Sequence, residues 1–97
     1  MEATLSRDLL RDRTAAIARA LADAKRLCVL ETLAEGERSV SELSREVGCQ
    51  VPNMSQHLAV LRSAGIVATR RDGSTVYYRL ADQQVLEIYR LLQQVAR

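Results

Sequence analysis

The chain has 97 residues, of which 47% are apolar, and a formal net charge of +2 at pH 7. This length supports one domain, residues 1–97, and the absence of a long apolar run excludes a membrane-spanning helix. The N-terminus lacks the basic and then apolar pattern of a secretory signal peptide, so we expect a cytoplasmic protein.

The positive charge is concentrated in one part of the chain. Residues 1–47 carry eight Lys or Arg and nine Asp or Glu, a net charge of −1. Residues 48–81 carry four arginines and one aspartate, a net charge of +3, and residues 82–97 balance. This local excess indicates a surface that contacts phosphate groups, although four arginines alone also fit an ordinary solvated surface.

Two helices are predicted in the first third of the chain. Apolar residues recur at helical spacing from Leu5 to Leu21, which predicts an amphipathic first helix. Asp23 can cap a second helix over about residues 24–34, and Gly36 follows its end.

A helix-turn-helix is predicted over residues 39–64. Ser39 or Ser41 begins its first helix, and Glu42 lies three residues after Ser39, which is the spacing of a capping box. Gly48 suits the left-handed backbone position just past the end of a helix.

The second helix of this motif begins near Pro52, the only proline, which suits the first turn of a helix. Met54, Leu58 and Leu61 recur at helical spacing and predict one buried face. Gly65 ends the helix. Polar side chains therefore occupy the opposite, exposed face.

A β-hairpin is predicted over residues 66–80. Two β-prone runs, residues 66–71 and 74–80, flank Asp72 and Gly73, and this dipeptide is a strong hairpin signal. The hairpin would form the wing of a winged helix-turn-helix.

A last helix is predicted after Asp82, which can cap it. The order is then ααααββα, a mainly α fold with a small β-hairpin. Residues 1–22 and 82–97 have broad apolar faces that a minimal winged helix does not need, so we expect them to form a dimer interface. A dimer would place two reading helices about 34 Å apart on a palindromic site.

The exposed face of the helix after Pro52 carries side chains that can read base edges. A major groove is read by groups that both donate and accept, and Asn or Gln can bond bidentately to adenine. We expect base-edge contacts from Asn53, Ser55 and Gln56, and a phosphate contact from Gln50. His57 fits either a DNA contact or a structural role beside a core leucine.

The hairpin supplies the cations of the predicted interface. Arg70, Arg71 and Arg79, assisted by Thr75, fit contacts to phosphate or to the minor groove. Such contacts raise affinity and salt dependence but carry little sequence information. These residues together predict a sequence-specific regulator that binds double-stranded operator DNA.

Four stretches carry a family resemblance: Asp23-Ala-Lys-Arg-Leu27, Ser41-Glu-Leu43, Ser55-Gln-His-Leu-Ala-Val-Leu-Arg62 and Val76-Tyr-Tyr-Arg-Leu80. They resemble the ArsR/SmtB family of bacterial repressors, and the likeness covers about residues 14–95. It implies a homodimeric winged helix in which the first and last helices form the interface. It also implies repression of an operon that is relieved when an inducer alters the dimer.

The inducer sites of that family differ here. Metal-sensing members often carry Glu-Leu-Cys-x-Cys-Asp-Leu where this chain has Glu42-Leu-Ser-Arg-Glu-Val47. They also carry Asp-x-His, and a later His, where this chain has Asp82-Gln-Gln84 and Val95. One His and two Cys are too few for a four-ligand zinc site. We therefore expect no metal and no other cofactor, and the inducer stays unknown.

Two cysteines are candidate thiol sensors. A structural disulfide is not expected in a cytoplasmic protein. Cys28 falls outside the apolar arc of its helix, which predicts access to oxidants or soft metals, whereas Cys49 follows Gly48, where an apolar residue usually packs back. Thiol-sensing members of the family pair a second-helix cysteine with one near the end of the last helix, which is missing here. A sensor pair and two small structural residues both stay open.

Two other functions fit the sequence less well. A winged helix that contacts only proteins, without its own operator, would expose apolar side chains where this chain exposes polar ones. An enzyme is not supported, because the chain has one His, no Gly-rich phosphate loop and no nucleophile–base motif. The sequence therefore predicts a homodimeric repressor.

Overall fold

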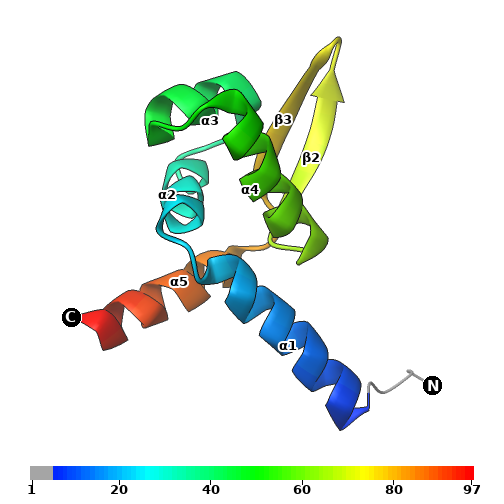
Figure 1. The fold of residues 1–97 in the computed structure, drawn as a ribbon, viewed down its shortest axis with the longest axis vertical. Helices are drawn as coiled ribbons and strands as arrows, with labels where there is room; N and C mark the ends of the chain where they lie inside the picture. Colours follow the sequence, from blue (N-terminus) through cyan, green and yellow to red (C-terminus); the bar gives the residue numbers. More distant parts are fainter. Residues whose placement is uncertain (1–5) are drawn as a thin grey trace.

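The computed structural model describes residues 6–97, so Leu5 of the predicted first helix lies outside the described residues. Five helices and a small sheet are arranged as shown in Figure 1. Their order is α1 (Arg7–Leu21), α2 (Ala24–Leu33), β1 (Arg38–Ser39), α3 (Val40–Val47), α4 (Val51–Ser63), β2 (Val67–Asp72), β3 (Thr75–Leu80) and α5 (Gln83–Ala96). The predicted order of helices and hairpin is confirmed.

The strand β1 was not predicted. Its two residues, Arg38 and Ser39, pair in antiparallel fashion with Tyr78 and Tyr77 of β3, which gives a sheet in the order β1-β3-β2. Two residues are too few to show the alternation by which a strand is recognised in sequence. Ser39 is also the N-cap of α3, so β1 joins the sheet directly to the helix-turn-helix.

The hairpin turn lies one residue later than predicted. Asp72 pairs with Thr75 at the end of the ladder, so the two-residue loop is Gly73-Ser74. Gly73 has a φ of 63°, and Ser74 has a negative φ. This pattern matches a II′ turn, which takes glycine at its first central position and suits the twist of a hairpin.

The core is built by the middle of the chain. Each helix from α2 to α4 contributes side chains with no exposed surface: Val29, Leu30, Leu43, Met54, Leu58 and Leu61. The predicted buried face of α4 is confirmed, because Met54, Leu58 and Leu61 are among them. Ile66 and Val67, where β2 begins, close the core beneath α4.

The terminal helices diverge from this body, as Figure 1 shows. The radius of gyration is 14.3 Å, whereas a compact domain of this length has about 12.5 Å. Only Ala20 and Leu21 of α1 and Tyr89 of α5 are buried. Six large apolar side chains of these two helices remain exposed: Leu9, Leu10, Ile88, Leu91, Leu92 and Val95. Among the described residues, no helix combines the length and apolar character needed to cross a membrane.

Candidate nucleic-acid interface

The turn between α3 and α4 is fixed by backbone geometry and by a lysine from α2. Ser39 and Glu42 form the predicted capping box at the start of α3. Gly48 ends the helix with a φ of 78°, the left-handed conformation that favours glycine. The ammonium group of Lys25 donates to the carbonyl oxygens of Val47 and Gly48 at 3.2 and 3.1 Å. These bonds hold the start of α4 in a defined place.

The helix α4 presents its polar side chains to solvent. Gln50 is the N-cap, but its side chain makes no capping hydrogen bond and is therefore available to a ligand. Asn53, Ser55 and Gln56 are exposed, as predicted for base-reading residues. The buried face of the same helix is packed into the core, so the orientation of these side chains is set by the fold.

The predicted reading residues do not form one continuous patch. Gln50, Asn53, Gln56 and His57 line one depression together with Lys25, Gly48 and Cys49, here called the polar depression. Ser55 instead lies on the side of α4 that faces the wing, in a second depression with Arg62 and Tyr78. The exposed surface of α4 therefore has two sides. The amide side chains of Gln50, Asn53 and Gln56 lie on one side, and Ser55 lies on the other.

His57 contacts a neighbouring helix. Its side chain is half-buried, and its Nδ1 lies 3.3 Å from Nη1 of Arg26 on α2. The guanidinium group of Arg26 also bonds the last turn of α1. Both sequence interpretations of His57 are compatible with this position, because the ring contacts the protein and also lines the polar depression.

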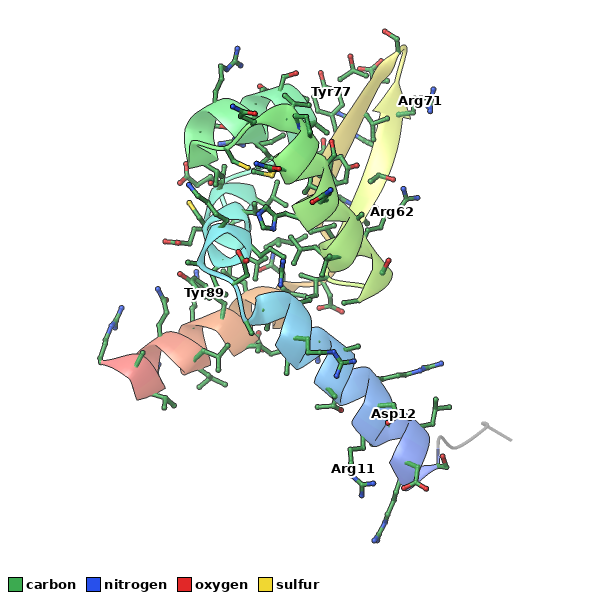
Figure 2. All side chains as sticks on the ribbon, viewed as in Figure 1. Arg11, Asp12, Arg62, Arg71, Tyr77 and Tyr89 are labelled. Carbon is green, nitrogen blue, oxygen red and sulfur yellow. The ribbon has the colours of Figure 1, made fainter. Side chains whose placement is uncertain are left out.

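The predicted wing residues lie on two faces of the hairpin. Directly paired residues share a face, and successive residues alternate between faces. Tyr78 faces α4, so the pairing of Arg71 with Val76 places Arg71 on that same face. Arg70, Thr75 and Arg79 lie on the opposite face. Figure 2 shows Arg71 near the tip of the wing, where its side chain points away from the body.

Arg70 is held by other protein groups. Its Nε donates to both carboxylate oxygens of Glu37 at 2.8 and 2.9 Å. Its guanidinium carbon lies 4.8 Å from the ring centre of Tyr77, an arrangement that attracts a cation to the ring. This donation to the Glu37 carboxylate raises the pKa of Arg70, so the group stays charged. Its charge is partly balanced before any DNA is present.

Cys28 is half-buried and packs against the core. Its access to oxidants or soft metals stays a prediction. Tyr89 of α5 lies nearby, and the pKa of Tyr89 is raised by its burial and by the neighbouring Glu31 and Cys28. Cys49 is also half-buried and packs back on the core, as expected after Gly48. Both cysteines are free thiols.

Sequence reasoning did not assign roles to Lys25, Arg26 and Glu37. The sequence did contain an indication that Lys25 and Arg26 contact other parts of the protein. They lie in the first turn of α2, where the positive end of the helix dipole disfavours cations. Two basic residues at such a position indicate partners outside their own helix. Glu37 gave no comparable signal, because its contact with Arg70 spans 33 residues of chain.

Three comparisons place this geometry among known proteins. The family model described as bacterial regulatory protein, arsR family, matches residues 23–69. The transcriptional regulator KmtR of Mycobacterium tuberculosis is 53% identical over 70 residues, which are 72% of this chain and 54% of KmtR. The chain thus spans about half the length of that relative. The biofilm growth-associated repressor of Agrobacterium fabrum is 42% identical over 78 residues, 80% of this chain and 67% of the relative.

The fold has close counterparts among solved structures. The homodimeric winged helix-turn-helix DNA-binding domain of Mb0332 from Mycobacterium bovis superposes with a TM-score of 0.86 and 37% identity. This match covers 99% of the chain and 90% of that domain. The predicted winged helix-turn-helix is therefore confirmed.

Proposed function

The chain belongs to the ArsR family of bacterial regulatory proteins, and we propose that it is a homodimeric transcriptional repressor that binds a palindromic DNA operator. The observation that carries this proposal is the exposed polar face of α4. Asn53 and Gln56 are held outward on a helix whose other face is completely buried. Amide side chains fixed in this way can bond adenine bidentately in the major groove.

The wing supplies a sequence-independent part of the binding. Arg71 and Arg79 are exposed on opposite faces of the hairpin. If the hairpin lies along a DNA groove, each of its faces approaches a different strand. Two arginines on opposite faces can then contact phosphate groups of both strands. Arg70 would contribute its Nη groups while Glu37 keeps its Nε. This contribution adds affinity that falls with salt.

A second copy of the chain would cover the terminal helices. An apolar groove between α1 and α5 is lined by Thr14, Ile17, Ala18, Leu21, Ala22, Ile88 and Leu92. Six large apolar side chains of the same two helices are exposed, and such a concentration is typical of an interface. The related Mb0332 domain is homodimeric, and the relative from Agrobacterium is named a repressor. We infer the same assembly and the same sign of regulation here.

The inducer is the least specified part of this function. Cys28 and Cys49 are separate free thiols on α2 and just before α4. A thiol-based signal would therefore act on one or both of them, and not through the pair of α2 and α5 cysteines that thiol-sensing family members use. An organic inducer would need neither cysteine, so replacing both with alanine tests which class of signal is sensed.

The experiment selects duplexes from a randomised pool with the wild-type protein and then measures their binding by fluorescence anisotropy. The selected duplex should bind far more tightly than a scrambled one of the same composition. Gln56→Ala should reduce this preference by a factor of about 5 to 160, because one base contact discriminates by about 1–3 kcal/mol. Gln83→Ala, the same change at an exposed position on α5, should have no effect. A wild-type protein that enriches no sequence would instead support a winged helix that contacts other proteins.

A further inference from the structure

Arg26 occupies a position that its own helix does not favour. It lies in the first turn of α2, near the positive end of the helix dipole. Its side chain is nevertheless only 16% exposed, and its charge lies 3.7 Å from the carboxylate of Asp23. Besides Asp23 at the cap of its own helix, Arg26 contacts groups of two other helices.

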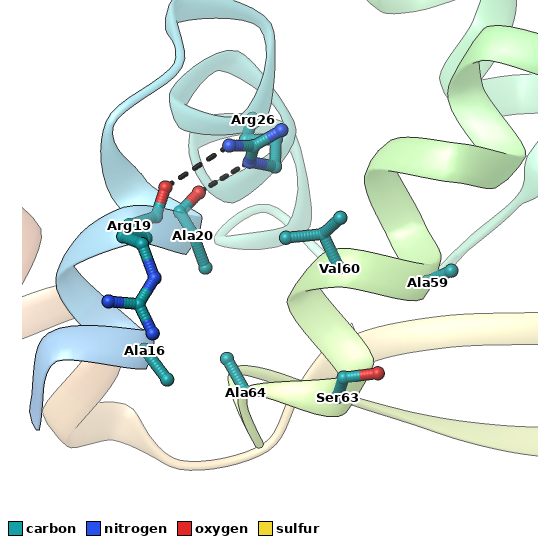
Figure 3. A pocket seen from close by; sticks show the side chains of 8 residues that line it. All are labelled: Ala16, Arg19, Ala20, Arg26, Ala59, Val60, Ser63 and Ala64. Atoms are coloured by element: carbon teal, nitrogen blue, oxygen red, sulfur yellow. Dashed lines mark hydrogen bonds between the residues drawn. The ribbon is translucent and has the colours of Figure 1, made fainter. Parts of the chain in front are cut away.

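Two of these contacts are with the end of α1. Figure 3 shows the guanidinium of Arg26 at the rim of a pocket between α1 and α4, with bonds to two carbonyl oxygens of α1. Its Nε donates to the carbonyl of Ala20 at 2.6 Å, and its Nη2 donates to that of Arg19 at 3.1 Å. The last carbonyls of a helix lack partners within the helix. Arg26 therefore caps α1 from α2, which fixes the plane of the guanidinium.

The third contact determines the state of His57. Nη1 of Arg26 lies 3.3 Å from Nδ1 of the imidazole. A guanidinium group has donors only, so Nδ1 must accept this bond and carry no proton. The proton of the neutral ring is then on Nε2, because the bond made by one ring nitrogen sets the state of the other. Within residues 6–97, this contact is the ring's one hydrogen bond to the protein.

The Nε2–H has no hydrogen-bond partner among residues 6–97. His57 lines the polar depression together with Gln50, Asn53 and Gln56. We propose that Arg26 is a positioning residue that fixes His57 as a neutral donor, protonated on Nε2, to an acceptor atom of the DNA. This inference rests on the proposed function. The acceptor would be a base-edge atom such as guanine N7 or O6, or thymine O4, which accept from the major groove.

The first test needs no DNA. The chain has a single histidine, so the ¹⁵N spectrum of its imidazole needs no assignment. The free protein at neutral pH should show a protonated Nε2 and an unprotonated Nδ1. Arg26→Lys keeps the charge but loses the planar donors, and the two tautomers should then mix. A wild-type ring protonated on Nδ1, or an identical spectrum in the Arg26→Lys variant, would overturn the proposal.

The second test uses two matched variants on the selected duplex. His57→Asn keeps an acceptor close to the Nδ1 position but has no group at Nε2. His57→Gln keeps an N–H donor close to the Nε2 position but has no acceptor at Nδ1. The Asn variant should bind about three- to tenfold more weakly, the usual loss for one hydrogen bond, with an unchanged melting temperature. The Gln variant should keep most of the affinity and lose thermal stability.

A double variant makes the positioning role measurable. Arg26→Lys alone should weaken binding to the selected duplex, but adding it to His57→Asn should cause no further loss. Additive losses would show that Arg26 acts independently of the imidazole ring. If the His57→Asn variant bound the selected duplex as tightly as wild type does, His57 would not donate to DNA. If wild type prefers no duplex, the proposed function fails. The imidazole spectrum then still decides whether Arg26 fixes the ring.

Discussion

The body formed by α2, α3 and α4 and the pair of terminal helices use the same kinds of residue in opposite ways. In the body, leucine and valine side chains such as Leu30 and Leu43 are completely buried. On α5, Leu91 is 59% exposed and Val95 is 85% exposed. The body completes its core within one chain. Among residues 6–97, nothing covers the apolar faces of the terminal helices in the same way.

This difference separates two kinds of stability. Interactions inside the body act within one molecule, so their free energy does not depend on concentration. In the proposed dimer, interactions of α1 and α5 with a second copy would follow mass action, so their contribution would rise with concentration. The reading helix α4 is packed into the body, whereas its spacing from the α4 of the partner would be set by the terminal helices.

The largest expected effect is the loss of folding stability when a buried side chain of the body is truncated. Leu30→Ala should lower the free energy of unfolding by about 2–5 kcal/mol, because it leaves a cavity at a completely buried site. Leu91→Ala removes the same atoms from an exposed site on α5. Its effect should be much smaller in dilute protein and should grow with concentration. Chemical denaturation followed by circular dichroism at two protein concentrations measures the loss of unfolding free energy in each variant. Equal losses in the two variants would show that the body and the terminal helices do not differ in this way.

The next largest effect is on the association of two copies in the proposed dimer. Leu92→Asp places a charge in the apolar groove, and it does so twice in a symmetric dimer. Burying an unpaired charge is costly, so dimerisation should weaken on the order of 100-fold. Sedimentation velocity measures this change, with Gln94→Asp, an exposed position on the same helix, as the control. The helical content should stay native, and an unfolded Leu92→Asp chain would mean that the body needs the terminal helices in order to fold.

The body was largely predictable from sequence because its signals are local. The capping box of Ser39 and Glu42 and the left-handed Gly48 act within a few residues. The buried face of α4 repeats at helical spacing, so Met54 and Leu58 could be assigned without knowing their partners. Asp23 caps α2 in the same local way. Each of these predictions needed only one helix and its ends.

The contacts that tie helices together were not predictable, because they join residues far apart in sequence. Arg26 and His57 are 31 residues apart, and Arg70 and Glu37 are 33 residues apart. The half-buried position of Cys28 could not be predicted for the same reason. A helical wheel of α2 shows its apolar arc but not that Tyr89 of α5 lies beside Glu31 and Cys28.

A smaller effect concerns the junction between the regions, at the N-cap of α2. The hydrogen bond from the amide of Arg26 lowers the pKa of Asp23, and the charge of Arg26 adds to this. Asp23→Ala should destabilise the fold by about 0.5–2 kcal/mol, the usual loss for a removed cap. Asp23→Asn should cost less, because the amide oxygen can still accept at the cap.

The contribution of the Asp23 charge can be tested by measuring stability as a function of pH. A group whose pKa is depressed in the folded state stabilises it fully above the unfolded pKa, and this stability is lost as the pH falls through the folded value. The ordinary value for Asp23 is 3.8. The difference in melting temperature between wild type and Asp23→Asn should therefore be constant above about pH 5 and shrink below pH 4. A difference independent of pH would show that the charge of Asp23 contributes nothing.

A smaller effect tests whether the wing contacts DNA. Arg71→Ala should reduce the slope of log affinity against log salt by about 0.9, the value for one lost phosphate contact. Arg90→Ala removes the same charge from α5 and should leave the slope unchanged. Neither change should alter dimerisation, because neither residue lines the apolar groove.

Arg70→Ala should change this slope less than Arg71→Ala does. Arg70 is already paired with Glu37 at 2.8 Å and stacked on Tyr77, so a phosphate meets a cation whose charge is partly balanced. Arg71 has no such carboxylate partner among residues 6–97. Anisotropy titrations at four salt concentrations measure the two slopes. Equal slopes would show that Glu37 releases Arg70 when DNA binds, and the Glu37→Gln variant should then bind scrambled and selected duplexes more tightly by the same factor.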